Sequence, residues 1–199
     1  MTGITTEMVK QLREKTGAGM MDCKRALEES GGNFDQAIEH LRKKGAATAA
    51  KRSDKETNQG VVEAYIHAGG RIGSMVELNC ETDFVAKTPE FKQLAHDIAM
   101  QIAAMSPRYI SREQVEKETA QKELEIYKSQ AENEGKPANI AEKIAQGRLE
   151  KFYQEFVLME QSFIKDSGKT IKDLIDEQTA KVGERISIRR FHRYHLGEN

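Results

Sequence analysis

The hydrophobic pattern of this chain changes at Gly60 from helical to strand-like, and this change constrains the fold more than any other feature. After Gly60, apolar and polar residues alternate along two segments that are joined by the turn sequence Ala68–Arg71. Such a pattern is typical of an antiparallel β-hairpin. In the returning segment, one face is expected to lie in a core: Val76, Leu78 and Cys80. Because helical patterns occupy most of the remaining sequence, we predict an α+β fold, a small antiparallel sheet packed with helices.

Residues 1–46 have the pattern of three short helices. Thr5 or Thr6 can cap the first helix, which ends at Gly17, and Asn33 can cap the third. The second helix is expected to turn one face inward: Met20, Cys23, Ala26 and Leu27. A bundle of this size has a thin core, so we predict a helical domain that is only marginally stable alone.

Residues 47–59 differ from the segments on both sides. Small residues lead into the polar run Lys51–Gln59, which has almost nothing apolar to bury. Such a segment cannot build a core of its own. We therefore predict a hinged linker, partly helical at its start, that joins residues 1–46 to a core domain at residues 60–199.

The core domain is expected to continue from the hairpin with helices and a last strand. Its further elements are a helix that begins at Thr88 and Pro89, a charged helical segment near 111–160 with helix starts at Ser111 and Asn139, a short helix over residues 170–182 and a strand over residues 185–196. The caps and breaks in the sequence set these boundaries. The last strand is predicted to pair with the hairpin.

The charge and hydropathy patterns restrict the partners of this chain. The formal net charge is only −1, which gives no electrostatic case for nucleic acid or for an anionic membrane. No apolar run approaches the roughly 20 residues that cross a bilayer. The first residues, Met1–Glu7, lack the basic and apolar regions of a secretory signal. We expect a cytoplasmic protein with no membrane partner and no direct nucleic-acid partner.

The sequence offers no arrangement that points to catalysis or to a bound cofactor. The Walker spacing of glycine, lysine and Ser/Thr does not occur, and no Ser/His/acid or Cys/His constellation follows from the spacing. His192 and His195 would point to opposite faces of the last strand, so one metal bound by both is improbable. Cys23 and Cys80 are expected to be buried free thiols. We predict no catalytic residue, no metal and no cofactor.

The segment Thr82–Val85 interrupts the strand pattern just before the helix that begins at Pro89. It places Phe84 beside Asp83 in a connection where chains usually carry polar residues. Loops carry a disproportionate share of function. In a purely structural interpretation, Phe84 folds back into its own core and Asp83 caps the next turn. The residues alone leave both interpretations open.

Two long motifs resemble the elongation factor Ts family, whose members exchange the nucleotide of the GTPase elongation factor Tu. Leu12–Leu27 resembles the first signature of that family, and Glu77–Lys87 resembles the second. The resemblance continues through shorter stretches and covers essentially the whole chain: Gly147–Leu149, Met159–Gln161 and Phe163–Asp166. It implies a ubiquitin-associated-type domain at residues 1–46 and a role in translation elongation, with GDP-bound and nucleotide-free elongation factor Tu as partners.

The resemblance also implies which residues meet the partner. Thr82–Val85 would enter the GTPase near its magnesium and phosphate site, with Phe84 as a wedge between helices and Asp83 as a hydrogen-bonding group. Thr82 and Val85 would hold the shape of the segment. A second contact would come from four residues of the N-terminal domain: Lys10, Arg13, Met20 and Met21.

The length of the chain bears on its oligomeric state. The resemblance implies that larger members of the family carry two related core halves. A chain of 199 residues leaves room for one such half. A homodimer would then supply two halves. Two departures from the family pattern accompany this expectation: Ser162 stands where the pattern leads one to expect Pro, and the last strand has no cysteine to lock a dimer by a disulfide.

Two other classes of function remain open. An adaptor or RNA-binding protein could use the helical domain and a basic, aromatic stripe on the last strand: Arg185, Arg189, Arg190, Phe191, Arg193 and Tyr194. The alternative for this stripe, which we favour, is a sheet edge whose long basic side chains discourage aggregation. An enzyme using Glu81 and Asp83 as acid and base would need a cleft and shifted pKa values, for which the sequence shows no cause.

Overall fold

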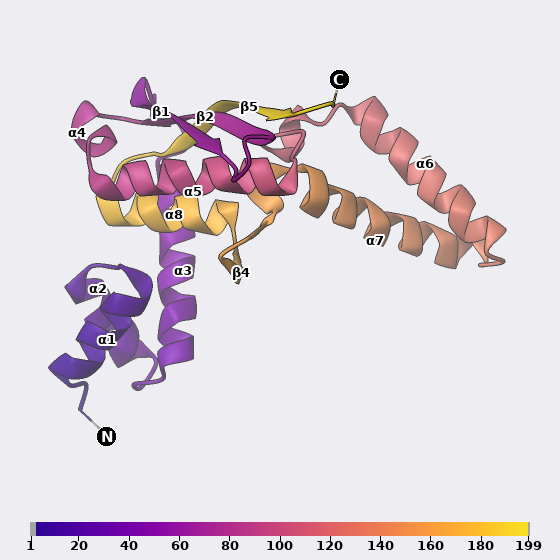
Figure 1. The fold of residues 1–199 in the computed structure, drawn as a ribbon. Helices are drawn as coiled ribbons and strands as arrows, with labels where there is room; N and C mark the ends of the chain where they lie inside the picture. The colour runs from indigo at the N-terminus through magenta and orange to yellow at the C-terminus, as the bar shows by residue number, and fades with distance from the viewer. Residues whose placement is uncertain (1–2, 199) are drawn as a thin grey trace. The chain divides into compact units, whose positions relative to one another are not determined.

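The computed structural model describes residues 3–198, which form eight α-helices, two short 3-10 helices and five strands within that range (Figure 1). The described chain divides into two compact units, and each draws on several stretches of sequence. Unit 1 comprises the residues up to Glu63, Glu77–Ala95 and Asp173–Arg189; unit 2 comprises Ala64–Val76, His96–Lys172 and the residues from Arg190 onward. The predicted division into residues 1–46, 47–59 and 60–199 follows chain order and stays a prediction.

The N-terminal helices begin and end at the residues whose chemistry favours those positions. They are α1 (Thr6–Thr16), α2 (Met20–Glu29) and α3 (Phe34–Lys51). Thr5 caps α1, because its Oγ1 accepts a hydrogen bond from Met8 N at 3.2 Å. Gly17 ends α1 with φ of 67°, a left-handed conformation that glycine adopts without steric cost. Asn33 caps α3, as predicted.

The three helices share a small core of six buried residues: Val9, Leu12, Cys23, Ala26, Leu27 and Ala37. Met20 was expected on this inward face, but its side chain is 37% exposed. The expectation was wrong because α2 begins at Met20, so that its first side chain lies beyond the edge of the core. The helix α3 continues through Lys51, since the run of alanines after Gly45 favours helix.

The main sheet has three strands in the order β1-β2-β5: β1 (Gln59–Ile66), β2 (Ile72–Cys80) and β5 (Ser187–His195). The predicted pairing of the last strand with the hairpin is confirmed. Val76, Leu78 and Cys80 are completely buried, which confirms the predicted inward face of β2. On β1 the apolar residues face outward instead, and Ile66 is 66% exposed. A second, antiparallel pair joins β3 (Ser162–Phe163) to β4 (Asp166–Thr170).

The helix α5 (Pro89–Met105) begins at the predicted cap, where Thr88 Oγ1 accepts a hydrogen bond from Phe91 N at 3.3 Å. Its buried side chains supply much of the core: Phe91, Leu94, Ala95, Ile98, Ala99, Ile102 and Ala103. Within unit 2, Ser74 Oγ donates a hydrogen bond to Ala99 O at 2.5 Å and ties β2 to α5. The helix α8 (Ile171–Val182) follows β4 and is the last helix of the described residues in chain order.

The charged segment near 111–160 forms a helical hairpin of α6 (Lys117–Asn133) and α7 (Ala138–Phe156) (Figure 1). The expected helix start at Ser111 was wrong. Arg112–Gln114 form only a 3-10 turn, because Val115 adopts an extended conformation and is buried against Phe152 and Val157.

The expected start of the second hairpin helix at Asn139 was also wrong. Pro137 takes the cap position, and its carbonyl oxygen accepts hydrogen bonds from Ile140 N at 2.9 Å and Ala141 N at 2.8 Å. Proline suits a helix start because its φ is preset and it has no N–H to satisfy. A second 3-10 turn, Leu158–Glu160, follows α7 and leads toward β3.

Gly60 lies where β1 approaches β2 so closely that a side chain does not fit. A Cβ at this position would lie 2.1 Å from Leu78 O and 2.8 Å from Asn79 Cα, both backbone atoms. We therefore expect Gly60→Ala to lower the free energy of unfolding by about 2 kcal/mol, measured by urea denaturation.

Gly147→Ala is the matched control for this prediction. Gly147 lies in α7 with no atom within 4 Å of its would-be Cβ. The same substitution there should stabilise the chain by roughly 0.5–1 kcal/mol, because alanine favours helix. Equal effects at the two positions would contradict the close approach at Gly60.

Candidate functional site: an exposed aromatic turn after β2

The segment after β2 forms a short helical turn, α4 (Asp83–Ala86), and not the open loop that the sequence suggested. Thr82 caps this turn: its carbonyl oxygen accepts a hydrogen bond from Ala86 N at 3.3 Å, and its Oγ1 lies 3.5 Å from Val85 N. The side chain of Thr88 closes the other end by donating to Val85 O at 2.8 Å. The four residues from Thr82 to Val85 are therefore held in one compact turn.

Phe84 projects from this turn into solvent. Its side chain is 79% exposed, whereas Cys80 is completely buried and Ala86 is 5% exposed. The structural interpretation, in which Phe84 folds back into its own core, is therefore wrong. An exposed phenylalanine on an ordered turn gives up favourable burial in the free chain.

The same structural interpretation expected Asp83 to cap the next turn, but Asp83 does not do so. Its carboxylate accepts a hydrogen bond from Lys87 Nζ at 2.5 Å, and this contact lowers its pKa. Thr88 takes the capping role instead. The Asp83 and Lys87 side chains are 47% and 73% exposed, so their pair is a weak one that another partner can replace.

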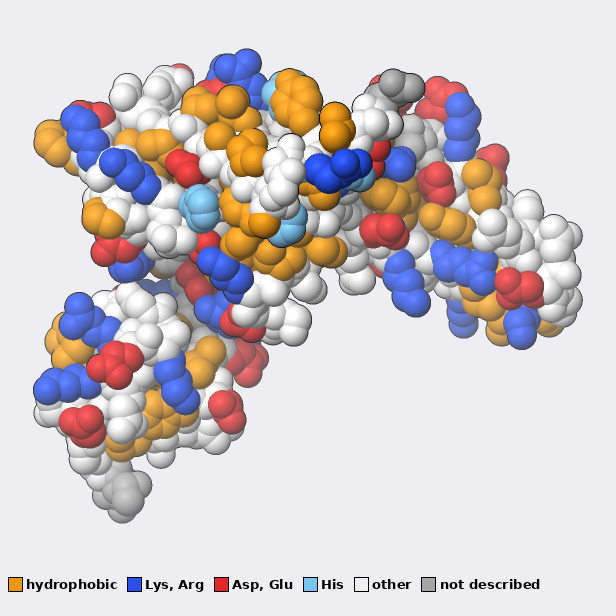
Figure 2. All heavy atoms as spheres, viewed as in Figure 1, with side chains coloured by type: hydrophobic (Ala, Val, Ile, Leu, Met, Phe, Trp, Pro, Cys, Tyr) orange, Lys and Arg blue, Asp and Glu red, His pale blue; other side chains and the backbone are white. Residues whose placement is uncertain are grey.

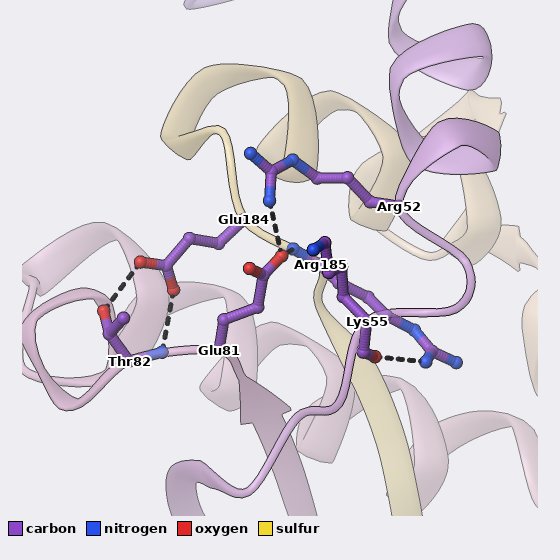
Figure 3. Close-up of polar contacts among 6 residues, drawn as sticks. All are labelled: Arg52, Lys55, Glu81, Thr82, Glu184 and Arg185. Atoms are coloured by element: carbon purple, nitrogen blue, oxygen red, sulfur yellow. Dashed lines mark hydrogen bonds and ion pairs between the residues drawn. The ribbon is translucent and has the colours of Figure 1, made fainter.

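A carboxylate from a distant part of the sequence holds Thr82 in place. Glu184 accepts hydrogen bonds from Thr82 N at 3.0 Å and from Thr82 Oγ1 at 2.6 Å (Figure 3). Cys80 Sγ donates to Thr82 O at 3.1 Å. Burial, followed by the nearby charge of Glu184, raises the pKa of the Cys80 thiol to about 11, so this side chain stays a neutral donor.

Glu81 forms the second half of the same arrangement. Its Oε1 accepts hydrogen bonds from Arg185 N at 2.6 Å and from Arg52 Nη1 at 2.7 Å (Figure 3). The Arg185 backbone N–H and the Arg52 guanidinium hold the pKa of Glu81 below its usual range. Arg185 in turn donates through Nη1 to Lys55 O at 2.5 Å.

These contacts do not favour a general-acid role for Glu81 or Asp83. A general acid needs a pKa raised toward neutrality, but the contacts lower the pKa of both Glu81 and Asp83. The two carboxylates therefore lack the shift that the enzyme interpretation requires. What the site offers is a fixed backbone that carries an exposed aromatic ring.

The four N-terminal candidates lie on α1 and at the start of α2, around the core of the three N-terminal helices, and all are exposed: Lys10, Arg13, Met20 and Met21. Met21 is 67% exposed. The fold thus brings Thr82–Val85 together in one turn and leaves the other four on a separate set of helices. Their role in binding stays a prediction.

The basic side chains of β5 have partners within the chain. Arg193 Nε donates to Ala103 O at 3.0 Å, and Arg189 Nε lies 3.6 Å from a carboxylate oxygen of Glu77. Together with the bond from Arg185 to Lys55 O, these contacts tie three arginines of the stripe to the rest of the fold. They favour the interpretation of this stripe as part of the sheet.

Sequence reasoning missed Glu184 and Arg52 as parts of the site. Glu184 is 102 residues from Thr82, and no motif spacing links the two. One local signal was present: Gly183 ends α8 in a left-handed conformation, with φ of 73°, and so redirects the chain just before Glu184. A glycine in this position predicts a helix end but not the contact that follows.

None of the helices between residues 3 and 198 combines the length and the apolar character that a membrane span requires.

The chain is similar to known proteins along nearly its whole length. A model of the family described as Elongation factor TS matches residues 3–198. Elongation factor Ts of Carboxydothermus hydrogenoformans is 63% identical over 195 residues, which cover 98% of this chain and 90% of that protein. Elongation factor Ts of Moorella thermoacetica is 61% identical over 190 residues, covering 96% and 94%. The protein of the same name from Desulfitobacterium hafniense is 59% identical over 198 residues, covering 100% and 91%.

The lowered pKa of Glu81 predicts how its contribution to stability depends on pH. A carboxylate whose pKa is depressed by folding stabilises the folded state fully above the unfolded pKa, about 4.3, and loses that contribution as the pH falls through the folded value. We expect Glu81→Gln to lower the free energy of unfolding by about 1 kcal/mol at pH 7. Urea denaturation between pH 3.5 and 7 should show the difference from the intact chain shrinking below about pH 4.

Glu90→Gln is the control, because Glu90 is an exposed carboxylate at the start of α5. Its curve should run parallel to that of the intact chain. A difference for Glu81→Gln that stays constant down to pH 3.5 would show that the ionised carboxylate contributes nothing.

Proposed function

Because this chain belongs to the elongation factor Ts family, the nucleotide-exchange factors of elongation factor Tu, we propose that it accelerates GDP release from that GTPase in the cytoplasm by disturbing its Mg²⁺ and phosphate site. The observation that supports this mechanism is Phe84, 79% exposed on a turn whose backbone is fixed from several sides. GTP then binds the emptied site, and translation elongation continues.

Phe84 acts as a wedge in this mechanism. It enters between helices of the GTPase domain, while Asp83 exchanges its weak pair with Lys87 for hydrogen bonds to the partner. Thr82 and Val85 hold the turn in shape. A Mg²⁺ ion is often the largest local charge in a nucleotide site. Shifting the segments that hold this ion therefore weakens the binding of GDP strongly, although no covalent bond changes.

Exchange follows from thermodynamic linkage. If this chain weakens nucleotide binding by some factor, nucleotide weakens the binding of this chain by the same factor. The chain therefore binds nucleotide-free elongation factor Tu most tightly, and incoming nucleotide expels it. Such a mechanism needs no general acid, no general base and no cofactor on this chain.

The N-terminal helices make a second contact with the partner in this proposal. Lys10 and Arg13 supply charge on α1, and Met20 and Met21 supply adaptable apolar surface at the start of α2. Since these residues lie apart from Phe84, their contribution is to affinity and orientation and not to the displacement of Mg²⁺.

We further propose that two copies of this chain associate through the outer face of the sheet in unit 2. We call this face the apolar sheet face, and its exposed residues are Ile66, Met75, Tyr194 and Leu196. Figure 2 shows hydrophobic side chains gathered over the strands at the top of the view. A second copy is the occupant that suits it, because the face lies on a sheet whose outer strands, β1 and β5, are both sheet edges.

Stopped-flow release of a fluorescent GDP analogue from elongation factor Tu tests the wedge. The intact chain should accelerate release, and Phe84→Ala should reduce the acceleration about 30-fold, the equivalent of roughly 2 kcal/mol lost at a central contact. Since Phe84 is exposed, thermal unfolding should stay unchanged. Arg13→Glu should instead raise the concentration needed for half-maximal acceleration.

Ile140→Ala, an exposed apolar residue on α7, is the matched control and should behave as the intact chain does. Acceleration of GDP release by Phe84→Ala equal to that of the intact chain would contradict the role of Phe84 as a wedge. No acceleration by the intact chain with a matched partner would remove the exchange function, and RNA binding measured against salt would come next.

Sedimentation equilibrium tests the homodimer. The intact chain should sediment with the mass of two chains at micromolar concentration, and Ile66→Arg should shift it to the mass of one, because a charge cannot be buried unpaired in an apolar interface. The control is Ile126→Arg, an exposed isoleucine on α6 outside this face. A monomeric intact chain, or equal disruption by both variants, would contradict the proposed interface.

A further inference from the structure

Glu184 lies at a point where the end of α8 meets the end of β2, within unit 1. The last turn of α8 closes with a hydrogen bond from Gly183 N to Thr179 O at 2.9 Å, and Gly183 adopts φ of 73°. This left-handed residue turns the chain so that the Glu184 side chain points at Thr82 (Figure 3). The backbone at Gly183 therefore places Glu184 beside Thr82.

The two oxygens of Glu184 satisfy two donors of one residue. Oε2 accepts from Thr82 N at 3.0 Å, and Oε1 accepts from Thr82 Oγ1 at 2.6 Å. Because the hydroxyl gives its only hydrogen to Glu184, its lone pairs are left for Val85 N, 3.5 Å away. Glu184 thus fixes both the backbone of Thr82 and the orientation of the hydroxyl that caps α4.

The contacts of Glu81 complete a reciprocal clamp. Glu81 accepts from Arg185 N at 2.6 Å, while Glu184 accepts from Thr82 N. The pair Glu81–Thr82 follows β2, and the pair Glu184–Arg185 precedes β5. In each pair, the glutamate carboxylate accepts a hydrogen bond from a backbone N–H of the other pair. Charge-assisted bonds of this kind are about twice as strong as neutral ones.

We propose that Glu184 is a positioning residue for nucleotide exchange: through Thr82 it holds α4 in the form that projects Phe84 toward the partner. The inference rests on the proposed function of Phe84. A single helical turn of four residues has no stability of its own, since helix nucleation is unfavourable. Its order in the free chain depends on anchors at its ends, and an ordered turn meets the partner without a further loss of entropy.

The test uses an indole placed on the turn, because the chain contains no tryptophan. In Phe84→Trp, time-resolved fluorescence anisotropy reports the local motion of α4 with no partner present. Adding Glu184→Gln should at least double the amplitude of the fast local decay. In the chain with Phe84 intact, Glu184→Gln should reduce the acceleration of GDP release about tenfold, while the midpoint of urea unfolding falls no further than in Glu81→Gln.

Four variants, one of them a control, isolate the route through Thr82. Glu90→Gln removes an exposed charge near the turn and should change neither readout. Thr82→Val removes the hydroxyl at nearly constant size and should reproduce the effect of Glu184→Gln, whereas Thr82→Ser should retain the behaviour of the intact chain. The double variant Glu184→Gln with Thr82→Val should be little worse than either single one, because both act on the same contact.

The outcomes separate this inference from the exchange function. Unchanged anisotropy and unchanged GDP release in both Glu184→Gln and Thr82→Val would overturn the positioning role. Additive losses in the double variant would also overturn it, because Glu184 would then act by a route other than Thr82. Failure of the intact chain to accelerate release would remove the exchange function, while greater motion in the anisotropy experiment would still establish that Glu184 orders the turn. Should Glu184→Gln unfold the chain, Thr82→Val carries the same test.

Discussion

The exposed turn of this chain depends on one exchange of hydrogen bonds between two pairs of consecutive residues. Glu81 and Thr82 follow β2, Glu184 and Arg185 precede β5, and each pair accepts a backbone N–H of the other on a carboxylate. Sheet pairing ends at this point of β2, so the ladder no longer fixes the backbone. The carboxylates take over that role where the chain leaves the sheet and must present an aromatic ring to solvent.

The same clamp explains why the chain keeps Phe84 exposed without losing order. An exposed phenylalanine forgoes the roughly 1.5–3 kcal/mol that burial of such a side chain provides. The residues around Phe84 keep the turn ordered. Cys80 and Ala86 are buried on either side of it, and Thr88 donates a hydrogen bond to Val85 O at its end. The arrangement therefore separates the residue that we propose meets the partner from those that maintain the fold.

Much of this fold follows from local signals in the sequence, and the exceptions have a common cause. The caps at Thr5, Asn33 and Thr88 were predicted because each acts within three residues of its own position. Ser111 failed as a helix start because a long-range burial, that of Val115 against Phe152 and Val157, overrides the local pattern. Alternation in β1 predicted a strand but not that its apolar residues would face outward.

The candidate site also has parts that local signals predicted and parts that they did not. The motif indicated Thr82–Val85 as the site, and the wedge role that it implies for Phe84 requires the exposure that the structure shows; the helical form of the segment was not predicted. Glu184 was unpredictable, because its contact with Thr82 exists only after α8 and β5 have packed within unit 1.

A turn that relies on such a distant residue is sensitive to changes far from it in sequence. Substitutions near the end of α8 would alter the presentation of Phe84 without touching the turn, because Gly183 sets the direction of Glu184 and Glu184 sets that of Thr82. The function of the turn is thus a property of the folded unit and not of the motif alone.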